Sequence, residues 1–230
     1  MPSIGLCTCV LVCCAVSYAV CGIPFGKIFA QRMSGIDLQK VGSGNIGTTN
    51  ALRAGGPKVA ILTLTFDCLK GVFGVLLGRW IIGAFGFGLD ASVTDPGAPG
   101  DFALSLVALA CLYGHIFSPY LKFKGGKGIA TGVGILFGFY WPLALVHLGI
   151  FIIVVALTKY VSLGSIITAG LVPFTVYLVF PEISLPALAI WALLGWTVVW
   201  AHRGNIRRLA SRSEAKLSFS KRVTKMDGEE

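Results

Sequence analysis

Three segments of this 230-residue chain combine glycine with hydroxyl, amide and basic side chains in a way that suits an anionic ligand. The first, at residues 42–53, is GSGNIGTTNALR. Glycine lets backbone N–H groups approach a ligand closely, and the hydroxyl, amide and guanidinium groups donate hydrogen bonds. The segment lacks the Gly-Lys-Ser/Thr ending of a nucleotide-binding P-loop. We therefore predict a phosphate site here, and a polar turn between helices is the alternative.

The second segment, GHIFSPYLKFKGGKG at residues 114–128, alternates lysines with aromatic and glycine residues. A helix that begins near Ile129 would add its N-terminal amides to these lysines, which favours a bound anion. Lys124 and Lys127 are the better candidates because glycines lie beside them. We expect Lys122 only to anchor the loop at the membrane surface.

The third segment, HRGNIRRL, begins at His202. If it is helical, His202, Asn205 and Leu209 share one face, and Arg203 and Arg207 lie together on another. The histidine and the asparagine together could orient a hydroxyl group. The alternative is a basic segment that only marks the cytoplasmic end of a membrane span.

The composition makes a lipid bilayer the natural solvent of this chain. Its residues are 55% hydrophobic and 13% charged, with a mean hydropathy of +0.82, whereas soluble domains are about 25% charged. Apolar runs lie at 4–26, 59–86, 102–120, 128–157, 162–180 and 184–201. The net charge of +9 is spread over the links between these runs, so we expect no nucleic-acid partner. The seven cysteines lie in the runs without metal-ligand or disulfide spacing, so we predict neither.

The charged links predict the orientation of the spans. Residues 90–101 carry three aspartates and no basic residue, and the PEIS link at 181–184 carries Glu182 alone, so both should face outward. The basic links should be cytoplasmic: 27–58, 122–127 and the residues after 200. These assignments conflict if 128–157 crosses once, because three crossings would then separate the second basic link from the third.

A break at Tyr140-Trp141-Pro142 resolves this conflict, because proline disrupts the preceding helical turn and aromatic residues favour the interface. We predict an all-α integral membrane protein with about seven transmembrane helices, its N-terminus outside and its C-terminus cytoplasmic. Residues 1–217 should form a single polytopic membrane domain, followed by a polar cytoplasmic tail at 218–230. The three segments become cytoplasmic motif loops, at 31–57, 119–128 and 202–217. The first apolar run has no basic residue before it, which favours an uncleaved anchor over a signal peptide.

Asp67 and Lys70 lie three residues apart near the middle of the second apolar run. Charged residues inside a membrane pair with one another and often mark a pathway or a functional site. An ion pair that only ties helices together is an equal alternative. His147, on an otherwise apolar span, is expected to be a packing residue.

The three segments, in this order on a small multi-spanning chain, resemble the bacterial membrane family of acyl-phosphate-dependent glycerol-3-phosphate acyltransferases (PlsY type). The resemblance rests on four motifs: GSGNIGTTNALRAGG at 42–56, DCLKG at 67–71, GHIFSPYLKFKGGKGIAT at 114–131, and HRGNIRRL with Glu214 at 202–214. The family pattern favours glycine where this chain has Arg212, which affects the geometry of the segment beyond Leu209.

The resemblance implies transfer of a fatty acyl group from acyl phosphate to the 1-hydroxyl of sn-glycerol 3-phosphate. The products would be lysophosphatidic acid and inorganic phosphate, in the first acylation step of phospholipid synthesis. The partners would be the two substrates and the lipid bilayer, with no metal and no cofactor. The protein would be a multi-pass protein of the bacterial cytoplasmic (inner) membrane, with its active site facing the cytoplasm. An acyl phosphate is already activated, so catalysis consists of aligning the hydroxyl and stabilising an oxyanion.

The resemblance also implies roles for individual residues. The substrate-binding candidates belong to the first two segments: Asn45, Thr49, Asn50, Arg53, Lys124 and Lys127. The catalytic candidates are His202 and Asn205, which would orient or deprotonate the attacking hydroxyl, and Ser43, which would also contact phosphate. Ser43 as a covalent acyl nucleophile is an alternative. In another alternative, a substrate phosphate accepts the proton and His202 only positions the hydroxyl.

Two other classes of protein are weighed against the acyltransferase. A transporter or channel for anionic metabolites could use Asp67 and Lys70, but the polar motifs cluster on one side of the membrane and the sequence has no internal repeat. A structural membrane subunit whose basic loops recruit anionic lipid would tolerate replacement of Arg53 or Lys127 if the total charge were kept.

Overall fold

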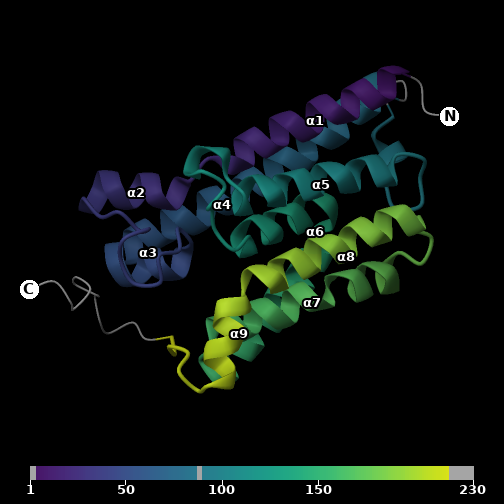
Figure 1. Ribbon diagram of the computed structural model, residues 1–230. Coiled ribbons are helices and arrows are strands. Elements are labelled where there is room, and N and C mark those ends of the chain that lie inside the picture. The colour runs from purple at the N-terminus through teal and green to yellow at the C-terminus, as the bar shows by residue number, and fades with distance from the viewer. Residues whose placement is uncertain (1–3, 87–89, 218–230) are drawn as a thin grey trace, which may run out of the picture.

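The computed structural model describes residues 4–86 and 90–217, and the predicted tail at 218–230 lies outside these ranges (Figure 1). Within the described ranges the chain is helical and contains no strand, as predicted. The α-helices are α1 (Ile4–Gly22), α2 (Phe25–Ser34), α3 (Thr48–Gly55), α4 (Pro57–Ile81), α5 (Asp101–Ile116), α6 (Ile129–Thr158), α7 (Val161–Val179), α8 (Leu185–Ala201) and α9 (Arg203–Ala210). Three short turns, η1 (Ile82–Gly86), η2 (Ala91–Thr94) and η3 (Pro119–Leu121), connect them.

The long helices lie side by side, and α2, α3 and α9 gather at the end of the bundle opposite the start of α1 (Figure 1). Helix α1 packs against α5 and α4, α4 against α6, and α7 against α8. Five helical stretches among the described residues are long and apolar enough to cross a membrane, and the bent pair α8–α9 makes a sixth candidate. The three short helices thus place the polar motifs together at one end.

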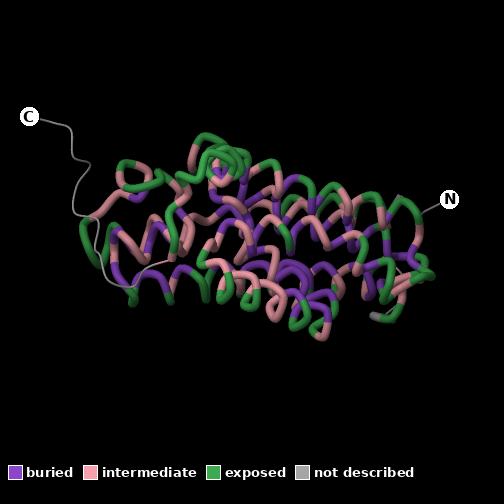
Figure 2. The backbone as a smooth tube through the Cα atoms, turned by 90° about the horizontal axis from the view of Figure 1, so that it is seen from below, coloured by how far each residue is buried: buried purple, intermediate pink, exposed green. Residues whose placement is uncertain are grey.

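The outer surface of the bundle is apolar. Leu157, Leu178 and Leu185 are 80%, 78% and 79% exposed, whereas Asp67 and Lys70 are buried. Figure 2 shows the buried residues along the inner sides of the helices and the exposed ones along the outer edges. Such large apolar patches would be costly in water and are covered by lipid in a bilayer. The distribution is that of an integral membrane protein.

Helix α6 reverses its direction at Tyr140, where the prediction placed a break. Tyr140 has the extended dihedral angles φ −157° and ψ 101° inside an otherwise helical segment. A straight helix of 30 residues would separate its ends by about 45 Å. Both ends of α6 instead lie at the α9 end of the bundle. Just before the helix, Lys127 bonds to Asn205 of α9, and just after it the Lys159 carbonyl accepts from the Leu217 amide at 2.7 Å. The break expected from the charged links is therefore present.

Two of the three segments predicted as loops contain helices. Helix α2 ends at Ser34 and α3 begins at Thr48, both inside the segment 31–57, and α9 lies inside the segment 202–217. The sequence of α3 is polar, but Ala51 and Ala54 form a small buried face that packs under the start of α4. A helix with such a narrow apolar face is anchored by its neighbour and gives little hydropathy signal.

Candidate active site

The first glycine-rich segment is ordered by Asn50. This side chain is 1% exposed, and its Oδ1 accepts a hydrogen bond from the Ser43 amide at 3.2 Å. Its Nδ2 donates to the backbone carbonyls of Leu38, Val41 and Asn45, at 3.0, 3.1 and 2.9 Å. The polar atoms of Asn50 are thus occupied by the segment itself. They keep Ser43 and Asn45 at the surface of the protein.

The second segment closes onto the end of α5. The Gly125 amide donates to the Ile116 carbonyl at 2.9 Å, and the Gly126 amide donates to the His115 carbonyl at 3.1 Å. A Cβ atom at Gly126 would lie 2.1 Å from His115 Nε2, so only glycine fits there. Helix α6 begins at Ile129, as predicted. Lys127 therefore extends from a backbone that has little freedom to move.

In the third segment, α8 and α9 form an angle of 55° around His202. His202 Nδ1 lies 2.8 Å from the Val198 carbonyl oxygen, and the side chain is buried. A carbonyl oxygen only accepts hydrogen bonds, so Nδ1 carries the proton and Nε2 is an acceptor. Burial, with a smaller contribution from the Lys127 charge, lowers the pKa of His202 to about 4, although the hydrogen bond to Val198 acts in the opposite direction. At neutral pH the ring is uncharged and offers a lone pair.

Glu214 joins the segment after α9 to the rest of this end of the bundle. Its Oε1 accepts from Asn205 Nδ2 at 2.6 Å and from Ser162 Oγ at 2.7 Å, and its Oε2 accepts from Arg208 Nε at 2.7 Å. Partial burial raises the pKa of Glu214, but these hydrogen bonds and the Arg208 charge outweigh it and hold the pKa below its usual value. The carboxylate therefore stays ionised and fixes Asn205, whose Oδ1 accepts from Lys127 Nζ.

Lys127 lies in a positively charged neighbourhood. Burial, with smaller contributions from the charges of Arg208 and Arg53, lowers its pKa to about 8, although the Glu214 charge acts in the opposite direction. These cations repel one another when no anion is present. A bound phosphate would remove this repulsion, so the electrostatics favour a dianionic ligand.

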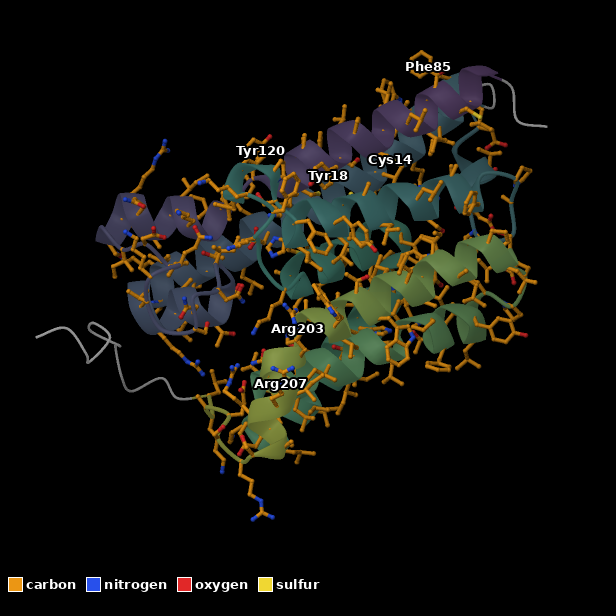
Figure 3. All side chains as sticks on the ribbon, viewed as in Figure 1. Cys14, Tyr18, Phe85, Tyr120, Arg203 and Arg207 are labelled. Atoms are coloured by element: carbon orange, nitrogen blue, oxygen red, sulfur yellow. The ribbon has the colours of Figure 1, made fainter. Side chains whose placement is uncertain are left out.

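Two adjoining cavities open at this end of the bundle, with volumes of about 310 and 300 Å³. Ser43, Lys127, Ala201 and Arg203 line both of them. The first cavity has an apolar wall that includes Ile116, Phe117 and Trp200, and the second is bordered by Asn205, Arg207 and Arg208. Figure 3 shows Arg203 and Arg207 at the junction of α8 and α9. One cavity is partly apolar and the other is mainly cationic, and Lys127 reaches both.

Residues 11–212 match the model of a protein family described as glycerol-3-phosphate acyltransferase. The chain belongs to the glycerol-3-phosphate acyltransferase family. This membership confirms the predicted resemblance and favours the acyltransferase over the transporter and the structural subunit.

Curated relatives from bacteria carry the name glycerol-3-phosphate acyltransferase. The protein of Bartonella quintana is 38% identical over 206 residues, which are 90% of this chain and 90% of that protein. The protein of Geobacter sulfurreducens is 41% identical over 204 residues, which are 89% of this chain and 95% of that protein. The similarity therefore extends over the spans as well as the three motif segments.

Two crystal structures of PlsY (YgiH), an integral membrane glycerol 3-phosphate acyltransferase, share this fold. The glycerol 3-phosphate form superposes with a TM-score of 0.77 at 30% identity and covers 91% of this chain and 96% of that chain. The lysophosphatidic acid form has a TM-score of 0.75 at 28% identity, with the same coverage.

The structure brings together most of the residues that the sequence singled out in this acyltransferase. Five of them line the cavities: Ser43, Asn45, Lys124, Lys127 and Asn205. Thr49, Asn50, Arg53 and His202 line neither cavity, although His202 lies between Ala201 and Arg203, which line both. Arg53 Nη2 lies 3.5 Å from the Ala215 carbonyl oxygen, and its charge acts on Lys127.

Sequence reasoning assigned no site role to several members of this site, although it named Glu214 as part of a motif. Arg203, Arg207 and Arg208 line the cavities, Glu214 accepts a hydrogen bond from Asn205, and Ser162 donates one to Glu214. The sequence did place Arg203 and Arg207 on one helical face, but only the bend at His202 brings them to the cavities. No local signal marks Ser162, whose partner Glu214 is 52 residues away.

Proposed function

We propose that this acyltransferase moves a fatty acyl group from acyl phosphate to the 1-hydroxyl of sn-glycerol 3-phosphate, with lysophosphatidic acid and inorganic phosphate as products. The observation that carries the proposal is the pair of adjoining cavities that share Ser43, Lys127 and Arg203. Two substrates that each carry a phosphate need two cationic places next to one reacting centre. The apolar wall of the first cavity suits the start of an acyl chain. The glycerol 3-phosphate and lysophosphatidic acid forms of the related PlsY support this choice.

The reaction is a direct displacement at the acyl carbonyl. The 1-hydroxyl oxygen of glycerol 3-phosphate bonds to the carbonyl carbon, and the bond from that carbon to the phosphate oxygen breaks. The Val198 carbonyl holds the proton on His202 Nδ1, which leaves the Nε2 lone pair to accept the hydrogen bond of the hydroxyl group and orient its oxygen. A histidine with a pKa of about 4 is a weak base at neutral pH, so the proton passes to the departing phosphate.

The cationic groups stabilise the charge that develops on the carbonyl oxygen and on the leaving phosphate. Lys127 and Ser43 line both cavities and can contact a group at their junction. Asn205 is held by Glu214 and orients Lys127. Arg53 supplies a further cation close to Lys127. Because acyl phosphate is already activated, no acyl-enzyme on Ser43 is required.

Thr49 and Asn50 have supporting roles in this mechanism. Asn50 gives all its polar atoms to the backbone of the first segment and thereby places Ser43 and Asn45. Thr49 lies in the first turn of α3. Lys124, at the rim of the first cavity, contacts the second phosphate.

The topology is a further part of the proposal. The N-terminus lies outside and the C-terminus in the cytoplasm, with seven crossings of the bacterial inner membrane, because α6 contributes two crossings that meet at Tyr140. All three motif segments then face the cytoplasm. A reporter inserted after Tyr140 should respond from outside the cell, whereas a cytoplasmic response there would rule out seven crossings.

The direct test supplies the purified protein in detergent with acyl phosphate and glycerol 3-phosphate. We expect lysophosphatidic acid and one equivalent of inorganic phosphate. Acyl-CoA in place of acyl phosphate is the control donor and should give no product. Failure to form lysophosphatidic acid from acyl phosphate by a protein that still melts cooperatively would refute the proposed donor.

A further inference from the structure

A second group of titratable side chains lies outside both cavities. It consists of Asp67 and Lys70 on α4 and His115 near the end of α5. Lys70 Nζ lies 2.7 Å from Asp67 Oδ1, and His115 Nδ1 lies 3.7 Å from the same oxygen. The three side chains are only 2 to 3% exposed. We call these three residues the buried cluster.

The buried cluster connects three parts of the chain. Lys70 Nζ also donates to the Ile23 carbonyl at 2.9 Å, and Ile23 forms the corner between α1 and α2. The Cys21 thiol, at the end of α1, donates to the Lys70 carbonyl at 3.3 Å. The hydrogen bond from Lys70 thus ties α4 to this corner, and Asp67 on the same helix lies against His115 of α5.

His115 is also the support on which the glycine-lysine loop, residues 125–127, lies. The Gly126 amide donates to the His115 carbonyl, and a Cβ atom at Gly126 would approach His115 Nε2 to 2.1 Å. A Cβ atom at Gly125 would lie 2.0 Å from the His115 carbonyl oxygen. The imidazole ring thus occupies the space that a side chain at position 126 would need. Any shift of this ring displaces Lys127, the next residue.

The buried cluster costs more than a structural link requires. An ion pair buried in a membrane protein loses its hydration, and well-packed apolar side chains stabilise a protein as well or better. His115 Nδ1 has no hydrogen-bond partner among the described residues. The charges do fix an orientation: the attraction between Lys70 and Asp67 holds the carboxylate where it faces one edge of the His115 imidazole ring.

We propose that Asp67, Lys70 and His115 are positioning residues, which hold the glycine-lysine loop so that Lys127 faces both cavities. This inference rests on the proposed role of Lys127 in binding phosphate. It resolves the two alternatives that the sequence left for Asp67 and Lys70 in favour of a functional role that is exerted through His115 and the loop.

The test is a double-mutant cycle between the buried cluster and Lys127. The pair variant Asp67→Leu/Lys70→Met removes both charges and leaves no unpaired ion. We expect it to melt within a few degrees of the wild type, while kcat/KM for glycerol 3-phosphate falls about tenfold or more, as for other small displacements of catalytic groups. In a Lys127→Met background the same pair change should cost less than about twofold, because the group that it positions is already absent.

Equal fold losses in the two backgrounds would overturn the proposal, and so would wild-type kcat/KM in a folded pair variant. If the pair variant does not fold, His115→Leu takes its place in the same cycle and is judged by the same criteria. His147→Gln is the matched control, since His147 is also a buried histidine but bonds to Thr175 between α6 and α7. It should leave kcat/KM unchanged, and a loss as large as that of His115→Leu would contradict the positioning role.

The experiment separates this inference from the proposed function. If wild-type protein gives no product with acyl phosphate, the proposed donor is wrong. The same four proteins are then compared by another quantity, the rise in melting temperature that glycerol 3-phosphate causes in each of them. Coupling between the buried cluster and Lys127 in that measurement supports positioning, and additive effects contradict it.

Discussion

The two charged clusters of this acyltransferase use similar side chains in opposite surroundings. Lys127 and Asn205 border an open cavity at the end of the bundle, and Glu214 holds Asn205 there, whereas Asp67, Lys70 and His115 are buried between α4 and α5. In the first cluster a carboxylate and an amide hold a lysine that faces space for a ligand. In the second, a carboxylate faces a lysine and a histidine with no such space. The difference is that, within the described ranges, the cavities carry unpaired cationic groups that suit an anionic ligand, whereas the buried lysine is already paired with a carboxylate.

The largest effect should come from removing the cation that reaches both cavities. We expect Lys127→Met to lower kcat/KM for glycerol 3-phosphate by about 100- to 1,000-fold, because a charge-assisted contact to phosphate is lost. Lys122→Met is the control, since Lys122 is exposed and lines neither cavity. Steady-state kinetics on purified protein measure both. Equal effects of the two changes would mean that only the total charge matters.

The next largest effect concerns Arg53, which affects Lys127 from outside the cavity linings. We expect Arg53→Lys to lower kcat/KM about 10- to 100-fold although it keeps the charge, because a planar donor with two parallel N–H groups becomes a point charge. Arg32→Lys, on the exposed part of α2, should have no effect. Near-normal kinetics for Arg53→Lys would remove Arg53 from the site.

The open cluster should also respond to pH in a range where most lysines do not. Lys127 has a pKa of about 8, so its charge is present below pH 8 and is lost as the pH rises through that value. The phosphate of the substrate stays dianionic there, since its second pKa is about 6. We expect KM for glycerol 3-phosphate to rise about tenfold between pH 7 and pH 9. In Lys127→Arg, KM should change little between pH 7 and pH 9, because the guanidinium group stays charged. If KM in this variant still rises as in the wild type, the pH dependence comes from another group.

The smallest effect lies in the segment that brings Glu214 to the site. Arg212 has φ +57°, in the left-handed region that costs a non-glycine residue about 1 kcal/mol. Glycine adopts this conformation without strain. We expect Arg212→Gly to raise the free energy of unfolding by about 0.5 kcal/mol and to leave kcat/KM unchanged. Ser211→Gly, at φ −86°, should instead be destabilising, and thermal melts in detergent distinguish the two changes.

The spans and the reversal of α6 could be predicted because their causes are local or additive. Long apolar runs dictate membrane helices, and the signs of the charges between them required a break near Pro142, which the structure has at Tyr140. The short helices α3 and α9 were not assigned, because their buried faces consist of a few small or polar side chains. Their stability comes from the helices beside them.

The sequence by itself determined the membrane setting, the three glycine- and cation-rich segments and the reversal in α6. Only the tertiary structure decided which polar groups face a cavity. Asn50 bonds to the backbone near it, Glu214 bonds to Ser162, which is 52 residues away, and the His115 ring packs against Gly126. These contacts join residues that are distant in the chain, and they depend on the packing of whole helices. Residue type and spacing predict which groups can bind an anion, but the packing of the bundle selects which of them do.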